Sequence, residues 1–360
     1  MPECAYIHIP FCRRKCGYCA FVSYNRPELQ ENYVEKLLQE IKSRYKGENL
    51  KTIYFGGGTP SLLEIRQVEN ILKSLNFDKN TEITLEANPD SVDFAYLKEL
   101  KRLGINRLSL GVQSFDDKLL KITNRLHSGT QAKNAYKNAR KAGFENISLD
   151  FIYGLPEQSE NGFKKDLEKA ISLDSDHISL YGLKIEDGTP FSKQKFENIA
   201  DDDLQAQMYL SAIEILSGYE HYEFSNFAKN GKFSRHNLNY WDNEEYYGFG
   251  TAAHGYLDGK RYSNARNLEI YLKNPLLSEN EHNLTGKERL EEEIFLGFRR
   301  CAGIDTKKIN KKFSIDFDEK YSHILEKFKK SGHLIKTATG WKLSIDGILL
   351  SNEILCEFLD

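Results

Sequence analysis

The chain has 360 residues, which is enough for two or three domains of ordinary size. With 40% hydrophobic and 12% aromatic residues, the composition excludes a disordered protein. The 50 basic and 53 acidic residues nearly cancel, which excludes a broad basic surface for nucleic acid and disfavours a polybasic membrane anchor. No apolar run approaches the roughly 20 residues that span a bilayer, and no signal peptide is visible. We therefore expect a cytoplasmic protein with no transmembrane segment and no nucleic-acid partner.

Six short apolar runs in the first half of the chain predict β-strands. They lie at residues 5–9, 52–55, 83–85, 107–110, 147–151 and 177–180. Between them are segments with apolar residues at helical spacing, such as the one that follows Pro27 and the one that ends at Gly104. Six strands alternating with helices predict a parallel sheet with helices outside it, either an open doubly wound sheet or a barrel.

Polar residues at the ends of three of these strands favour the barrel. Glu86, Gln113 and Asp150 each stand at or beyond the end of an apolar run. Polar groups repeated at the carboxyl ends of successive strands are typical of the active face of a βα barrel. Because eight units are not visible, we expect a partial barrel of six units.

The pattern changes after about residue 190. Three aspartates at 201–203 predict the start of a helix that runs to about Leu216, whereas residues 220–270 are rich in aromatic residues, Asn and Gly and have weak periodicity. Helical segments from about Glu288, followed by a short hairpin near residues 340–344, predict a small α+β module of winged-helix type. Its mixed charge favours a packing or lid role over DNA binding. We expect three parts: a barrel at 1–190, a region completing or linking it at 191–285, and a small domain at 286–360.

Three of the six cysteines cluster directly after the first predicted strand, at Cys12, Cys16 and Cys19. Three thiolates on one loop suit an iron–sulfur cube, in which one iron then remains open to another ligand. The alternative is a zinc site completed by His8 or a distant residue, but zinc sites usually pair two C-x-x-C hooks. No second hook exists, because Cys301 and Cys356 are isolated. The spacing therefore favours the iron–sulfur cluster.

The segment from Tyr6 to Cys19, Tyr-Ile-His-Ile-Pro-Phe-Cys-x-x-x-Cys-x-Tyr-Cys, resembles the radical S-adenosylmethionine (SAM) superfamily, in particular its HemN/HemW branch. The resemblance extends to the segment around Ser351. It implies a partial βα barrel whose three cysteines hold a [4Fe–4S] cluster, with SAM on the fourth iron. It also implies an electron donor such as flavodoxin or ferredoxin, whose electron cleaves SAM to a 5′-deoxyadenosyl radical.

A glycine-rich loop, Gly56 to Pro60, follows the second predicted strand. Glycines let backbone N–H groups approach a ligand, although such loops are common and weak evidence alone. The resemblance assigns Gly57, Gly58 and Thr59 to the methionine part of SAM. By the same resemblance, the further SAM-binding residues are Tyr6, Tyr18, Glu86, Gln113, Arg125 and Asp150. Their chemistry agrees, because carboxylates bind hydroxyls or an ammonium group and arginine pairs with a carboxylate.

The branch contains two classes of protein: an oxygen-independent coproporphyrinogen III dehydrogenase, and a haem chaperone that delivers haem to recipient haemoproteins, membrane-bound ones included. Three features favour the chaperone. Phe21 stands where the dehydrogenase has a further cysteine, only a short segment precedes Cys12, and the stretch His236-Asn237-x-x-Tyr240-Trp241 matches a motif of the chaperones. A third interpretation, a radical SAM enzyme acting on another substrate, stays open, as does SAM cleavage itself.

We expect haem to bind at His236, Asn237, Tyr240 and Trp241, because imidazole is a natural axial ligand of haem iron and aromatic rings stack on a porphyrin. His254 is a competing imidazole. His8 and His127 are further candidates, but their motifs place them near the cluster and SAM.

Overall fold

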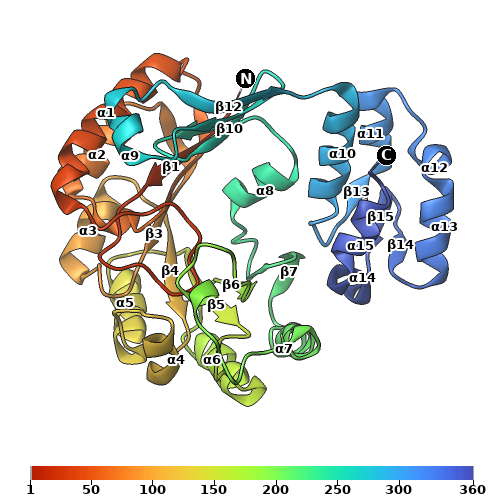
Figure 1. Ribbon diagram of the computed structural model, residues 1–360, viewed down its shortest axis with the longest axis horizontal. Coiled ribbons are helices and arrows are strands. Elements are labelled where there is room, and N and C mark those ends of the chain that lie inside the picture. Colours follow the sequence, from red (N-terminus) through yellow and green to blue (C-terminus); the bar gives the residue numbers. More distant parts are fainter. Residues whose placement is uncertain (1, 360) are drawn as a thin grey trace.

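The computed structural model describes residues 2–359. Six parallel strands follow one another in chain order across its main sheet (Figure 1). They are β1 (Cys4–Ile9), β2 (Leu50–Gly57), β3 (Phe77–Ala87), β4 (Arg107–Gln113), β5 (Ile147–Tyr153) and β6 (His177–Gly182). The six predicted strands and their parallel arrangement are thereby confirmed. All six extend beyond the apolar runs that predicted them.

Three short strands extend this sheet at its two edges. β9 (Tyr247–Phe249) pairs in parallel with β1, β8 (Asn226–Ala228) pairs antiparallel with β6, and β7 (Glu220–Glu223) pairs with β8. The edge strands β7 and β9 are not paired with each other, so the barrel is open. The predicted partial barrel is confirmed, and residues from the 191–285 region contribute to its sheet.

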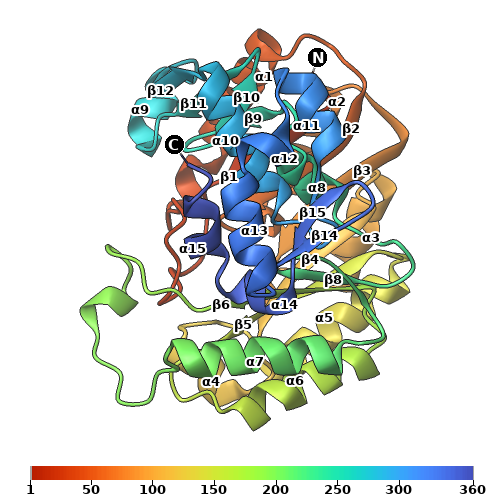
Figure 2. The same cartoon turned by 90° about the vertical axis from the view of Figure 1, so that its right-hand side faces the viewer.

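Helices cover the outside of the sheet (Figures 1 and 2). They are α1 (Gln30–Arg44), α2 (Ile65–Lys73), α3 (Phe94–Arg102), α4 (Asp117–Ile122), α5 (Gly129–Lys141), α6 (Glu160–Ser172) and α7 (Asp202–Ile215), with short 3₁₀ turns at Pro27–Leu29, Pro60–Leu62 and Phe191–Lys193. Side-chain caps fix several helix starts. The carboxylate of Asp201 accepts a hydrogen bond from the backbone N–H of Leu204 at 2.9 Å, which explains why the run of aspartates begins a helix.

Alternation along the strands separates an apolar outer face from a polar inner face. In β3, Ile83 and Leu85 are buried in the core between sheet and helices, while Glu82 and Glu86 point to the other face. The same alternation runs through β4 and β5, where leucines enter the core and Ser109 and Asp150 face inward. The barrel interior is therefore lined by polar and aromatic groups, as a binding site requires.

Residues 229–283 contain elements that the weak periodicity did not predict. They are α8 (Arg235–Trp241), the antiparallel strands β10 (His254–Leu257), β11 (Lys260–Asn264) and β12 (Ser278–Asn283), and α9 (Leu268–Lys273). These elements have four to seven residues each and are too short to show a clear period. In Figure 1, α8 lies between the barrel and the C-terminal part of the chain.

The C-terminal part has its own hydrophobic core, which includes Phe298, Phe317, Trp341 and Phe358. Its elements are α10 (Gly286–Gly297), β13 (Ile304–Asp305), α11 (Thr306–Phe313), α12 (Phe317–Lys320), α13 (Ser322–Lys330), β14 (Leu334–Lys336), β15 (Gly340–Leu343), α14 (Ile345–Leu349) and α15 (Ser351–Cys356). Helices followed by the β14–β15 hairpin confirm the predicted α+β module. No helix within residues 2–359 is long and apolar enough to cross a membrane.

Candidate functional site

A cavity of about 660 Å³ lies at the carboxyl ends of the parallel strands. We call it the barrel cavity. The three clustered cysteines line it, together with all the predicted SAM-binding residues except Tyr6: Tyr18, Gly57, Gly58, Thr59, Glu86, Gln113, Arg125 and Asp150. The fold thus brings together residues that are spread over almost 140 positions of the sequence. Tyr6 lines an adjoining cavity instead.

The cysteine loop lies between β1 and the first helix. The backbone N–H of Cys12 donates to the carbonyl of Tyr24 at 3.0 Å, and the Sγ of Cys12 is 3.4 Å from the hydroxyl of Thr59. All three thiols are free, and burial raises the pKa of Cys12 and Cys19. No three His, Cys, Asp or Glu side chains of residues 2–359 are arranged to hold one metal ion. A cube needs a different arrangement, because each cysteine binds a different iron, and three thiols around one cavity wall suit it.

Close backbone contacts explain the glycines of the loop that follows β2. Gly57 has a φ of +109°, and a Cβ there would lie 2.5 Å from the His8 ring. A Cβ on Gly58 would lie 2.8 Å from the carbonyl oxygens of Ile9 and Phe11. Any side chain at either position would push the loop away from β1 and the cysteine loop. The glycines therefore hold the backbone of this loop in the wall of the barrel cavity, beside the thiols.

Two buried carboxyl groups face the barrel cavity; among the described residues neither forms a direct ion pair, although the charge of Arg107 acts on both. Glu86 accepts hydrogen bonds from the hydroxyl of Tyr54 at 2.8 Å and from the N–H of Gly57 at 3.2 Å, and burial raises its pKa to about 7. Asp150 accepts from the hydroxyls of Ser109 and Ser148, both at 2.7 Å, and burial raises its pKa too. Such groups suit a ligand with an ammonium group and hydroxyls, as SAM has.

Arg125 connects the cysteine loop to the ends of β3 and β4. Its guanidinium donates to the side-chain oxygen of Asn88 and to the carbonyl of Gly111, both at 2.6 Å, and lies 3.6 Å from the Sγ of Cys16. Asn88 in turn donates to the hydroxyl of Thr59 at 3.1 Å. Sequence reasoning missed Asn88, although its position two residues after Glu86, at the same strand end, was a usable signal. The guanidinium forms no ion pair with a carboxylate of residues 2–359, so it is available to a ligand carboxylate.

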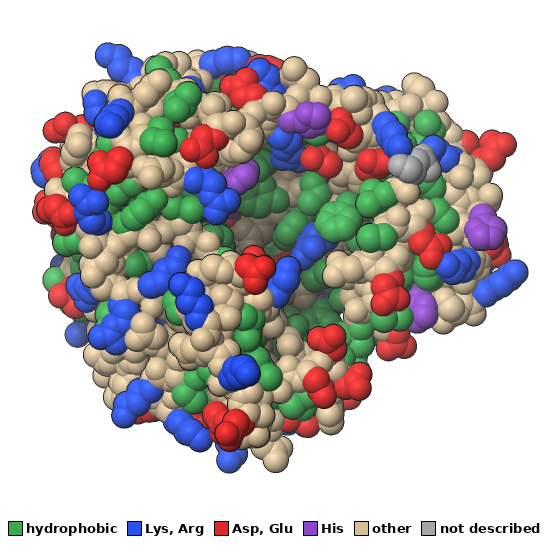
Figure 3. Space-filling model, in the orientation of Figure 1, with side chains coloured by type: hydrophobic (Ala, Val, Ile, Leu, Met, Phe, Trp, Pro, Cys, Tyr) green, Lys and Arg blue, Asp and Glu red, His purple; other side chains and the backbone are tan. Residues whose placement is uncertain are grey.

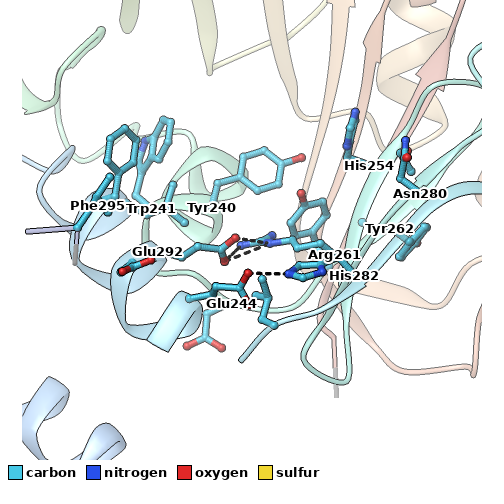
Figure 4. A pocket seen from close by; sticks show the side chains of 18 residues that line it. Tyr240, Trp241, Glu244, His254, Arg261, Tyr262, Asn280, His282, Glu292 and Phe295 are labelled. Carbon is cyan, nitrogen blue, oxygen red and sulfur yellow. Dashed lines mark hydrogen bonds and ion pairs between the residues drawn. The ribbon is translucent and has the colours of Figure 1, made fainter. Parts of the chain in front are cut away.

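Two further cavities continue from the barrel cavity toward the C-terminal part. The junction cavity, about 610 Å³, shares Phe21, Tyr54 and Glu86 with the barrel cavity and is also lined by the predicted haem residues His236, Asn237, Tyr240 and Trp241. The outer cavity, about 860 Å³, lies between α8, α10 and the β10–β12 sheet (Figure 4). The junction and outer cavities share Tyr240, Trp241, Tyr246 and His254. Figure 3 shows the hollow on this face, with hydrophobic side chains gathered around it.

His236 is a buried hydrogen-bonding residue of the junction cavity, with only 1% of its surface exposed. Its Nδ1 is 2.7 Å from the hydroxyl of Thr52 and its Nε2 is 2.8 Å from the hydroxyl of Tyr240. The ring stacks on Tyr54 at 5.0 Å, and burial lowers the pKa of His236 to about 3. The imidazole therefore connects α8 to β2, and both of its nitrogens are engaged.

The other candidate histidines are placed differently. His8 is also buried and engages both nitrogens, with Tyr6 and the carbonyl of Val22, so the zinc alternative with His8 gains no support. His127 bonds to the carbonyl of Val112 at 3.1 Å and lines none of the three cavities. His254 lines both the junction and the outer cavity.

A partial parallel barrel with three cysteines after its first strand and a glycine loop after its second defines a radical SAM protein. In agreement, the family model of the radical SAM superfamily matches residues 6–170, and that of the HemN C-terminal domain matches residues 284–350. Membership of the superfamily implies a [4Fe–4S] cluster and SAM. The cysteines and the polar wall of the barrel cavity are of the right chemistry for both.

Similar proteins of known name identify the family within the radical SAM superfamily. The chain is 39% identical to heme chaperone HemW of Lactococcus lactis, over 99% of this chain and 97% of that protein. It is 38% identical to heme chaperone HemW of Bacillus subtilis, over 99% and 98% respectively. The structure of coproporphyrinogen III oxidase (HemN) from Escherichia coli matches with a TM-score of 0.88 at 22% identity, over 99% of this chain and 90% of that one, which shows a shared fold. The chain belongs to the HemW family of radical SAM proteins.

Proposed function

We propose that this protein binds haem and delivers it to haemoproteins, with a [4Fe–4S] cluster and SAM held in the barrel cavity. The observation that carries the proposal is the pair of cavities rich in aromatic residues beside the barrel cavity. Tyr240, Trp241 and Tyr246 line both of them. Similarity to proteins named heme chaperones over nearly the whole chain supports it.

The chemistry of the junction cavity suits a flat apolar macrocycle with two carboxylates, whereas four glutamates line the outer cavity. Aromatic rings provide stacking surfaces for a porphyrin. Arg266 and Arg299 line the junction cavity, and neither forms an ion pair with a carboxylate of residues 2–359. The guanidinium of Arg299 lies 4.8 Å from the Trp241 ring centre. The Nε of Arg299 and the Nε1 of Trp241 are buried without hydrogen-bond partners, so a propionate in their reach would satisfy both.

The residues of the barrel cavity would hold the two cofactors. Cys12, Cys16 and Cys19 would bind the cluster, the glycine loop and Glu86 would bind the amino acid end of SAM, and Arg125 would pair with its carboxylate. When bound and reduced, the cluster and SAM supply one-electron chemistry. The recipient haemoproteins and an electron donor such as flavodoxin or ferredoxin complete the proposed partners.

Phe21 lies where the barrel cavity meets the junction cavity. It lines both the barrel and the junction cavity, and 65% of its surface is exposed. Its ring is apolar and cannot ligate a metal or transfer a proton. Phe21 therefore offers the macrocycle a contact surface at the position where the resemblance places a further cysteine in the dehydrogenase.

The test is anaerobic. The cluster is reconstituted, and haem or coproporphyrinogen III is added in separate samples with SAM and a reductant. We expect saturable, stoichiometric haem uptake, transfer of that haem to an apo-haemoprotein, and no protoporphyrinogen IX. Multiple-turnover decarboxylation would show that the protein is the dehydrogenase, and absence of saturable haem uptake would overturn the proposal.

A further inference from the structure

The haem proposal leaves open which side chain would bind the iron, and four histidines line the junction and outer cavities. Three of them are engaged elsewhere. His8 and His236 are buried with both ring nitrogens in hydrogen bonds, as described above. The Nε2 of His282 is 2.8 Å from a carboxylate oxygen of Glu288 at the start of α10. Each of these rings would have to give up a hydrogen bond before Nε2 could bind iron.

His254 is different in each respect. It is the first residue of β10, it is exposed, and its side chain has no hydrogen-bond partner among residues 2–359. It is the one histidine of the described chain that lines both cavities. Partial burial of the ring atoms, followed by the nearby Arg266 and Arg261, lowers the pKa of its imidazole. The ring is therefore neutral at physiological pH, which is the form that binds a metal.

The surroundings of His254 suit a porphyrin. Figure 4 shows His254 on the strand side of the outer cavity, and Trp241 and Phe295 on the helical side. An imidazole on one wall and aromatic rings on the other border this cavity of about 860 Å³, and Tyr240 and the Arg261–Glu292 pair lie between them in this view. Arg266 and Arg299 both border the junction cavity, where His254 is also exposed.

We propose that His254 is the axial ligand of the haem iron, and that His236 is a positioning residue that holds Tyr240 in the cavity wall. The inference rests on the proposed haem binding. A neutral imidazole with an unengaged nitrogen binds the iron without breaking an existing contact. Both nitrogens of His236 are already in hydrogen bonds, so this imidazole cannot bind iron without breaking a contact. Its removal would loosen α8 from β2 and leave the iron ligand in place.

The test compares haem complexes of the full-length protein by absorption and electron paramagnetic resonance spectroscopy. The variants are His254→Ala, His254→Met and His236→Gln, with His282→Ala as the matched control, since His282 is an imidazole of the same cavity. We expect His254→Ala to lose the spectrum of an imidazole-ligated iron and to bind haem at least tenfold more weakly. Added imidazole should restore that spectrum, and His254→Met should give the spectrum of a thioether-ligated iron.

The controls separate this inference from the function on which it rests. His236→Gln and His282→Ala should both keep the imidazole-ligated spectrum. If the wild type takes up haem but the spectrum of His254→Ala is unchanged, the ligand assignment is wrong and haem binding stands. If loss of the spectrum follows His236→Gln instead, His236 is the ligand. If the wild type binds no haem, the proposed function itself fails.

Discussion

A substitution of Glu86 tests the proposed SAM site directly, because the hydrogen bonds of its carboxylate show which interactions the substitution would remove. Its carboxylate accepts a hydrogen bond from the N–H of Gly57, so it lies beside the loop assigned to the methionine part of SAM. In this position it would receive the ammonium group of SAM. Glu86→Gln keeps the size of the side chain and an oxygen acceptor for Tyr54, and removes the charge.

The expected loss follows from the strength of a hydrogen bond between charged partners. Such a bond contributes about 1.5–3 kcal/mol, which corresponds to a Kd for SAM about 10- to 150-fold higher in the variant. The pH dependence has a definite sign. Burial raises the pKa of Glu86 to about 7, so at lower pH the carboxyl is increasingly protonated and cannot pair with the ammonium. Affinity of the wild type should therefore rise about fivefold between pH 6 and pH 7.

The assay is equilibrium dialysis of SAM against the protein with a reconstituted cluster, kept at or below pH 7 so that the amino group of SAM stays protonated. Glu86→Gln should bind weakly and show a flat pH profile. Glu99→Gln is the matched control, because Glu99 is half-exposed on α3, does not line the barrel cavity, and pairs with Arg102. A Glu86→Gln variant with wild-type affinity, or one that keeps the pH dependence, would refute the assignment of the ammonium partner.

Three further predictions concern the cluster, the haem carboxylates and the fold. Replacing any one of the three clustered cysteines with Ala should abolish the [4Fe–4S] absorption after reconstitution, whereas Cys301→Ala should keep it; unchanged iron and sulfide content in a cluster variant would contradict the assignment. Arg299→Leu should weaken binding of haem but leave binding of haem dimethyl ester unchanged, because the ester lacks the carboxylates; equal losses for both ligands would show that the residue only supports the fold. Glu40→Ala should lower the free energy of unfolding by about 3–5 kcal/mol in urea titrations, because its buried carboxylate binds groups from α1, from Gly250 directly after β9, and from α9. The exposed Glu35→Ala is its control, and a loss below about 1 kcal/mol would refute that estimate.

Local patterns allowed much of the barrel to be predicted. A strand of β-branched and aromatic residues and a helix cap such as Asp201 are properties of short stretches of sequence, and the structure confirms the strands and the helix that they predict. The cysteine spacing is local too, and the cluster that it predicts stays a prediction. The three short strands at the two edges of the main sheet could not be predicted in this way. β7, β8 and β9 have three or four residues each, and β8 and β9 pair with strands far away in the sequence, so their existence depends on the sheet that they join.

The residues of the barrel cavity were found partly from sequence motifs and partly from contacts that only the fold creates. The cysteine spacing, the glycine loop and three strand-end residues could be read from the sequence, and the parallel sheet brings them to one edge because all its strands end there. Asn88 and Tyr54 were not predicted, because their importance comes from the bonds they form to Arg125, Thr59 and Glu86.

The sequence by itself predicted the six strands, the three candidate cysteine ligands and the family, since these follow from patterns along the chain. Only the tertiary structure decided which histidine is engaged and which is accessible. The bond from His236 to Thr52 spans 184 residues, and the cavity around His254 is built from α8, α10 and the β10–β12 sheet. Burial and hydrogen bonding depend on neighbours that the fold supplies, and these decide whether an imidazole nitrogen is free to bind iron.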